Sequence, residues 1–299
     1  MVALLLTIFN GCQKDDPIIS QLTDEQPQEV VTNPMFVGLN DIAFSVEDNR
    51  LVFESEEEFQ KCIDFLANLG DKNFPLFEEE IGFESYRLAF ENNAEKAELF
   101  PDELFQTLLN PEMEIIVGQY LFKEDPINQK TYAYEFENCE TDIKSAIINK
   151  YEFRSSDDIF ALLKGEPSLK STYCDGNKLG YYYWNTSSGQ VQYKIVYQTG
   201  LYKSLQAKIK KDHSGGAEYI SLETDWTETT FYRNKKGCWT YTGSQGGYDR
   251  EYNLRPYYST RRLKAYRYKI YFYCSDQGYT PAVIHNTTLK ITCHESDGC

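Results

Sequence analysis

The segment YRYKIYFYC at residues 266–274 alternates two kinds of side chain with a period of two. One set is largely apolar and consists of Tyr266, Tyr268, Ile270, Phe272 and Cys274. The other set is basic and aromatic and consists of Arg267, Lys269, Tyr271 and Tyr273. Because successive side chains of a strand point to opposite faces of a sheet, the segment predicts a β-strand with one buried face and one solvated face.

The same alternation recurs on both sides of this segment. It is present in VQYKIVY at 191–197, LQAKIK at 205–210 and TLKIT at 288–292. Segments rich in Gly, Ser and Asn, such as NTSSGQ at 185–190 and TGSQGGYD at 242–249, separate the runs. Short alternating runs with turn-forming breaks are typical of antiparallel sheets. Residues 171–299 are therefore predicted to form a Tyr-rich antiparallel β sandwich or barrel.

The first half of the chain has a helical period instead. In SEEEFQKCIDFLANLG at 55–70, Ser55 and Glu58 form a capping box, and a helical stripe of apolar side chains ends at Gly70. Further helices are predicted over 74–92, 101–110 and 155–165, and strands over 114–122 and 130–136. The predicted fold class is α+β, with an acidic helical or mixed unit preceding the β unit.

Charge and tyrosine content divide the chain at the same place. Residues 17–170 carry 33 acidic and 12 basic side chains, a net charge of −21, whereas residues 171–299 carry 11 acidic and 17 basic side chains, a net charge of +6. Of the 24 tyrosines, 19 follow residue 170. A shift in composition of this kind predicts a domain boundary, so we expect one domain over 36–170 and a second over 171–299.

The amino-terminal segment combines an apolar run, VALLLTIF at 2–9, with NGCQKDD at 10–16. The run is too short to span a bilayer but has the length of a signal-peptide core, and Gly11 supplies a small residue at the cut. We expect a signal peptide over 1–11, whose natural start lies upstream because no basic residue precedes the run. Residues 12–35 are polar, carry prolines and are predicted to form a tether.

An apolar run that ends in Gly-Cys resembles the lipobox of bacterial lipoproteins. The resemblance implies cleavage before Cys12, acylation of Cys12 and anchoring in a membrane through its acyl chains. Gln13, Lys14, Asp15 and Asp16 are similar to the export signal with which Bacteroidota send lipoproteins to the outer face of the outer membrane. The segments 49–70 and 102–122, with the Tyr-rich tail, also resemble uncharacterised lipoproteins of Bacteroides. These resemblances imply a surface location and no activity.

Seven further cysteines form no C-x-x-C motif, and the chain has three histidines, so no metal site is predicted. Cys293 and Cys299 are the closest pair in sequence and are predicted to form a disulfide. The number of cysteines left is odd. Cys62 is predicted to stay free because it lies on the apolar face of a predicted helix.

The chain has no G-x-S-x-G, H-E-x-x-H, P-loop or G-x-G-x-x-G motif, so we predict no enzyme and no cofactor. Aromatic and basic residues are concentrated in RPYYSTRRLKAYRYK at 255–269. Such side chains suit sugars and acidic groups. The predicted ligand-binding residues are Tyr257, Tyr258, Arg261, Arg262, Trp226 and Trp239.

The sequence favours a binding or interaction protein, with a glycan or another envelope component as its partner. A nucleic acid is not expected, because the net charge is −16. Two alternatives stay open. A polysaccharide-acting enzyme would need two close buried carboxylates. A structural component of a surface complex would show an exposed apolar patch instead.

Overall fold

A computed structural model describes residues 34–136, 147–166, 174, 176–213, 216, 218–225, 228–232 and 238–293. The predicted lipid attachment at Cys12 and the predicted export signal at Gln13, Lys14, Asp15 and Asp16 lie outside the described residues. Trp226 and Cys299 lie outside them as well.

The first unit is a six-stranded sheet with helices on it, and its strands follow the order β1-β2-β3-β4-β5-β6. The strands are β1 (Phe44–Glu47), β2 (Arg50–Phe53), β3 (Glu114–Val117), β4 (Tyr120–Asp125), β5 (Lys130–Phe136) and β6 (Ile147–Arg154). All neighbours are antiparallel except β2 and β3, which are parallel. A parallel pair needs a long crossover, and the helical insertion between β2 and β3 provides it.

Five helices form this insertion, and a sixth follows β6. They are α1 (Glu56–Leu69), α2 (Phe74–Ile81), α3 (Tyr86–Ala89), α4 (Ala94–Ala97), α5 (Glu103–Leu108) and α6 (Ile159–Leu163). Three short 3-10 turns are η1 (Pro34–Phe36), η2 (Leu39–Asp41) and η3 (Asp71–Asn73). The predicted helix over 55–70 is confirmed: Ser55 Oγ accepts a hydrogen bond from Glu58 N at 3.2 Å. Of its apolar stripe, Phe59, Cys62, Ile63 and Leu66 are buried and Leu69 is partly buried.

Two predicted segments of this unit are each divided in the structure. The helix predicted over 74–92 breaks at Gly82, whose φ of 64° is left-handed, and Ser85 then caps α3. The strand predicted over 114–122 turns back at Gly118, whose φ is 60°, and becomes the hairpin β3–β4. In both cases a glycine reverses the chain inside a run whose apolar pattern is continuous.

The second unit consists of two antiparallel sheets packed face to face. The four-stranded sheet has the order β14-β9-β8-β7, with β7 (Lys178–Asn185), β8 (Gln190–Gln198), β9 (Lys203–Lys211) and β14 (Glu251–Ser259). The six-stranded sheet has the order β12-β11-β15-β10-β13, and β16 pairs with β15. Its strands are β10 (Glu218–Thr224), β11 (Thr230–Tyr232), β12 (Cys238–Thr240), β13 (Ser244–Gly247), β15 (Ala265–Asp276) and β16 (Val283–Cys293). The predicted α+β class, with a β-rich second half, is confirmed.

The strand predicted from YRYKIYFYC lies inside β15, at the centre of the six-stranded sheet. The side chains of its apolar set are all buried in the core between the two sheets, whereas Tyr271 is exposed. The four-stranded sheet contributes Tyr193, Ile195 and Leu205 to the same core. The alternation therefore predicted both the strand and its buried face.

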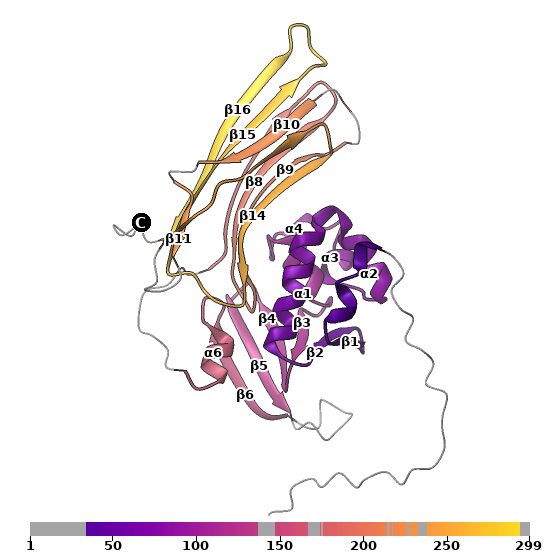
Figure 1. Cartoon of the computed structure of the whole chain (residues 1–299), viewed down its shortest axis with the longest axis vertical. Helices are drawn as coiled ribbons and strands as arrows, with labels where there is room; N and C mark the ends of the chain where they lie inside the picture. Colours follow the sequence, from indigo (N-terminus) through magenta and orange to yellow (C-terminus); the bar gives the residue numbers. More distant parts are fainter. Residues whose placement is uncertain are drawn as a thin grey trace, which may run out of the picture.

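The four-stranded sheet has a second neighbour on its other face. In Figure 1, β8, β9 and β14 curve past the helices of the first unit. The turn between β8 and β9 places Leu201 and Tyr202 in the first unit's core, next to Phe105 of α5. This sheet is therefore sandwiched between the six-stranded sheet and the helices.

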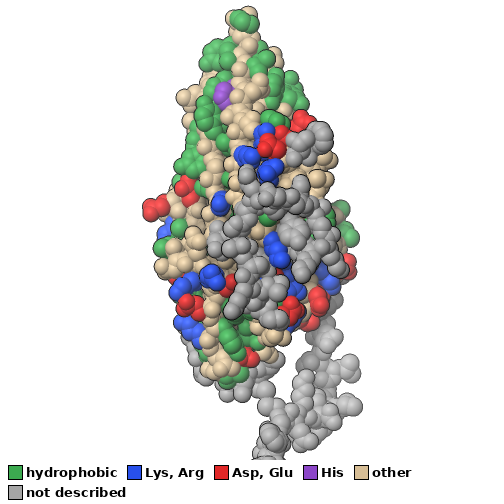
Figure 2. All heavy atoms as spheres, turned by 90° about the vertical axis from the view of Figure 1, so that its left-hand side faces the viewer, with side chains coloured by type: hydrophobic (Ala, Val, Ile, Leu, Met, Phe, Trp, Pro, Cys, Tyr) green, Lys and Arg blue, Asp and Glu red, His purple; other side chains and the backbone are tan. Residues whose placement is uncertain are grey.

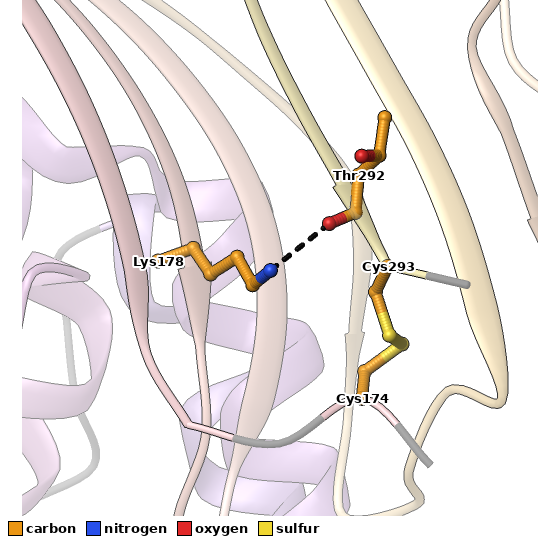
Figure 3. The surroundings of a disulfide bond; sticks show 4 residues. All are labelled: Cys174, Lys178, Thr292 and Cys293. Carbon is orange, nitrogen blue, oxygen red and sulfur yellow. Dashed lines mark hydrogen bonds between the residues drawn. A yellow bond between two sulfur atoms is a disulfide. The ribbon is translucent and has the colours of Figure 1, made fainter. Parts of the chain in front are cut away.

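A disulfide joins Cys174 to Cys293, with their Cα atoms 5.5 Å apart (Figure 3). The prediction that Cys293 pairs with Cys299 is therefore wrong. Cys293 ends β16 with its side chain turned into the sandwich core, where Cys174 meets it from the segment before β7. The prediction that Cys62 is free is confirmed; Cys274 is also free, and both are buried. Among the described residues, no helix combines the length and the apolar character needed to cross a bilayer.

Candidate functional site

The polar face of the four-stranded sheet presents two rows of side chains to the helices. Strand register aligns Tyr183, Gln192, Lys210 and Glu251 in one row, from β7 to β14. It aligns Tyr181, Lys194, Lys208 and Asn253 in the next row. These residues share a face because their neighbours along the strands, such as Tyr193 and Ile209, point into the sandwich core. The sheet therefore carries a ladder of charged and aromatic groups toward the first unit.

Arg255 of β14 makes the central ionic contact between the two units. Its Nη2 lies 3.0 Å from Asp71 Oδ1 and 2.8 Å from Asp102 Oδ1, and all three side chains are almost fully buried. Burial lowers the pKa of Arg255, but the Asp102 and Asp71 carboxylates outweigh it and hold that pKa well above its usual value. The Arg255 guanidinium therefore stays charged and connects η3 and the start of α5 to the sheet.

Lys208 makes a second set of ion pairs beside Arg255. Its Nζ lies 2.9 Å from Glu103 Oε1, 3.3 Å from Glu251 Oε2 and 3.5 Å from Asp71 Oδ2. Burial works against the charged form, yet the carboxylates raise the pKa of Lys208 above its ordinary value. Burial also raises the pKa of Glu103, but Lys208 and Lys194 more than offset this and lower it overall. Both groups are therefore ionised.

Asp71 and Asp102 are two close, buried carboxylates, which is the feature that an enzyme acting on polysaccharide would need. Both bind the Arg255 guanidinium. Both Asp102 oxygens already accept several hydrogen bonds, however. Oδ1 accepts from Leu104 N at 3.0 Å and from Arg255, and Oδ2 accepts from the Tyr202 hydroxyl at 3.1 Å and from the Ser204 hydroxyl. This carboxylate therefore caps α5 and binds the four-stranded sheet through Ser204 and Arg255.

A hollow of about 380 Å³ opens beside this cluster, between β7–β8 and helices α3 and α4. We call it the Tyr183 hollow. Its polar lining consists of Arg87, Lys194 and Lys210 with Glu91, Glu98 and Glu103, together with Gln106, Tyr183 and Gln192. Three cationic and three acidic side chains thus line it. A second hollow of about 420 Å³ shares Arg87, Glu103 and Lys210 with it.

Tyr183 of β7 forms the aromatic side of the hollow, and Tyr181 lies next to Tyr183 on the same face of the strand. Tyr181 and Tyr183 are 50% and 41% exposed, with ring centroids 5.5 Å apart. The Tyr183 hydroxyl accepts a hydrogen bond from Gln192 Nε2 at 2.8 Å, which fixes the ring beside the hollow. The run YYYW at 181–184 could have pointed to this surface, because its first and third residues must share a face.

Lys194 is the cation in the hollow that is not committed to a neighbour. Among the described residues, no hydrogen bond or ion pair reaches its ammonium group. Burial lowers the pKa of Lys194, while the Glu103 carboxylate raises it; burial has the larger effect. Arg87, by contrast, is bound to Glu78 through Nε at 3.0 Å and through a short contact from Nη2. Lys194 therefore has donors available for a ligand.

The predicted ligand-binding residues do not form one exposed surface. Tyr257 is buried, and its hydroxyl donates to the Arg261 carbonyl at 2.5 Å. Arg262 is buried near Asp157 and Asp158, at 3.9 and 3.8 Å, and Arg261 lies 3.7 Å from Glu56. These arginines pair with acids of the first unit, so they join the two units.

The two remaining predicted residues that the structure describes lie apart from each other. Tyr258 packs against the first unit's core. Trp239 is 42% exposed at the other sheet, with its ring 6.0 Å from Phe231. Within the described ranges, no group of three His, Cys, Asp or Glu side chains is arranged to hold a metal ion.

Comparisons with known proteins give little further information. No protein-family model matches the chain, and no curated protein matches it. Among solved structures, a DUF4848 family protein from Bacteroides thetaiotaomicron matches with a TM-score of 0.23 and 9% sequence identity. The match covers 83% of this chain and all of that chain. A TM-score of this size does not establish a shared fold.

Proposed function

We propose that this chain is a lipid-anchored surface protein that binds a saccharide in the Tyr183 hollow. The observation that carries the proposal is the combination of two exposed rings, Tyr181 and Tyr183, with the Gln192 amide and the uncommitted Lys194 ammonium on adjacent strands. Aromatic faces with polar groups at their edges suit sugar rings, which have an apolar face and hydroxyls around it.

The charges around the hollow favour an uncharged saccharide. Its cationic and acidic side chains are equal in number, and the whole chain has a net charge of −16, which repels polyanions. Arg255 and Arg261, which would suit acidic glycans, are paired with carboxylates of the first unit. Lys194 and Gln192 would then donate hydrogen bonds to hydroxyls, and Glu98 and Glu103 would accept them.

The location is proposed from the sequence. Lipid on Cys12 would anchor the protein in the outer membrane, with Gln13, Lys14, Asp15 and Asp16 as its export signal and residues up to 35 as a tether. The β7 tyrosines would then face outside the cell. Membrane fractionation of the Cys12→Ala variant tests this part, because a membrane-bound variant would contradict it.

We propose binding without turnover. The enzymatic alternative needs a general acid with a raised pKa and a second carboxylate facing the ligand. The buried pair Asp71 and Asp102 is occupied by Arg255. In the hollow, burial raises the pKa of Glu103, but Lys208 and Lys194 lower it overall, which does not suit a general acid. Release of reducing sugar from any polysaccharide that the protein binds would contradict this assignment. No nucleic acid and no cofactor enter the proposal.

A glycan array followed by calorimetry tests the binding site. Tyr183→Ala should weaken the best saccharide about tenfold, since an aromatic contact of about 1.4 kcal/mol corresponds to that factor. Lys194→Met should weaken it as well. Tyr279→Ala is the matched control, because Tyr279 is 46% exposed in the turn between β15 and β16. The proposal fails if no saccharide binds, or if both tyrosine variants behave alike.

A further inference from the structure

Strand β16 is an edge strand that is long and nearly unprotected. It pairs with β15 from Val283 to Cys293, and within the described residues no other strand pairs with it. Among the described residues, Lys178 of β7 reaches its outer side, where Lys178 Nζ donates to the Thr292 carbonyl at 3.1 Å (Figure 3). That carbonyl therefore points outward. Since peptide groups alternate along a strand, the N–H and C=O groups of Ile284, Asn286, Thr288 and Lys290 point outward too.

Four of the other edge strands are protected in ways that β16 is not, whereas β7 and β14, the edges of the four-stranded sheet, are long as well. Edge strand β6 carries Lys150, Glu152 and Arg154 at every second position, which is a common protection against pairing with another chain. Edge strands β1, β12 and β13 span four residues or fewer. Residues 277–289, in contrast, contain no Asp, Glu, Lys or Arg.

The same end of the molecule exposes apolar side chains. Ile284 is 59% exposed and Val283 is 41% exposed, with Tyr279 beside them in the turn. Figure 2 shows hydrophobic side chains gathered toward the narrow upper end, where the β15–β16 hairpin lies in Figure 1. Because residues 277–289 carry no Asp, Glu, Lys or Arg, two copies of the chain can meet along this edge without like charges at the contact.

We infer that β16 pairs antiparallel with β16 of a second copy of this chain, across a two-fold axis at Thr287. The outward-pointing peptide groups of Ile284, Asn286, Thr288 and Lys290 are spaced symmetrically on either side of Thr287. This register places Ile284 opposite Lys290 of the second copy, and Asn286 opposite Thr288 of the second copy. No like charges meet, and the bond from Lys178 to Thr292 stays in place. The inference concerns a surface separate from the Tyr183 hollow.

Sedimentation velocity tests the dimer, using the full chain with Cys12→Ala so that no lipid can be attached. At about 100 µM, well above a micromolar Kd, the mass should be twice the 34.8 kDa of one chain. Ile284→Lys should give monomers because it faces Lys290 of the second copy, whereas Ile284→Glu should keep the dimer. Ile148→Lys on β6 is the matched control, since Ile148 is 52% exposed and should leave the dimer intact.

Cysteine cross-linking tests the register. At the two-fold axis, Thr287 of one copy lies opposite Thr287 of the second copy in a pair without mutual hydrogen bonds. The Cα atoms of such a pair are about 4.5 Å apart, a distance that a disulfide can bridge. Thr287→Cys should therefore cross-link the dimer on mild oxidation much faster than Thr288→Cys. Unchanged thermal unfolding midpoints confirm that the variants are folded. The inference is overturned if the parent chain is a monomer, or if Ile284→Lys and Ile148→Lys dissociate the dimer equally. It is also overturned if Ile284→Lys and Ile284→Glu lose the dimer equally, or if Thr287→Cys and Thr288→Cys cross-link at the same rate.

Discussion

Replacing Arg255 by leucine should strongly destabilise the contact between the helices and the four-stranded sheet. The Arg255 guanidinium bridges Asp71 and Asp102, and the three side chains are 5%, 1% and 0% exposed. Removing one partner of a buried ion pair leaves charges buried without compensation, at a cost of about 3–5 kcal/mol. Asp71 keeps hydrogen bonds from Gln206 and Lys208, and Asp102 keeps its bonds to hydroxyls and to the α5 backbone, so we expect about 3 kcal/mol, the lower end of this range.

The assay is urea unfolding followed by fluorescence and circular dichroism. The matched control is Arg261→Leu, since Arg261 is 26% exposed and its nearest acid, Glu56, lies 3.7 Å away. A surface ion pair contributes about 0–1 kcal/mol, so the control should lower the free energy of unfolding by less than about 1 kcal/mol. If Arg255→Leu also costs less than about 1 kcal/mol, the account of Arg255 as the buried connection between the units is refuted.

The remaining predictions concern the disulfide and a buried acid. Cys293→Ser should lower the free energy of unfolding by about 2–5 kcal/mol because Cys293 pairs with Cys174. Cys299→Ser should leave the free energy of unfolding unchanged. Thermal unfolding of the two variants distinguishes this pairing from one between Cys293 and Cys299. Burial raises the pKa of Glu124 to about 7, although hydrogen bonds from Leu201 N and the Thr131 hydroxyl lower it. The folded state therefore binds a proton between pH 4.5 and 7 that the unfolded state has released, so the free energy of unfolding of the wild type should fall as pH rises through this window. Glu124→Gln should reduce this fall. Urea unfolding at pH 5 and pH 7 measures it, and an equal change in the free energy of unfolding in both proteins would contradict the prediction.

Periodicity in the sequence was sufficient for the secondary structure that rests on local rules. The helix that begins after Ser55 and the strand that holds Phe272 follow from spacing and capping, which involve near neighbours. Turns inside apolar runs were missed. Gly82 and Gly118 each reverse the chain within a continuous pattern, and a glycine with left-handed φ cannot be distinguished from any other glycine in the sequence.

The candidate site depends on contacts that are distant in sequence. The aromatic and basic residues near Tyr257 predict a ligand surface from the sequence, but in the structure Arg261 and Arg262 face acids of the first unit. The sequence does not show whether a basic side chain faces solvent or pairs with a carboxylate. Tyr183 and Lys194 form a surface because β7 and β8 pair beside helix α4, a neighbour that no local pattern specifies.

The sequence by itself determined the α+β class, the buried faces of its main helix and strands, and the free Cys62, because these depend on residue type and on spacing along the chain. The tertiary structure decided which acid meets which base, that Cys293 pairs with Cys174 and that β16 is left as an open edge. These outcomes depend on strand register and on the packing of one unit against the other. The ion pairs and the disulfide join residues more than a hundred positions apart, and local propensity carries no information about them.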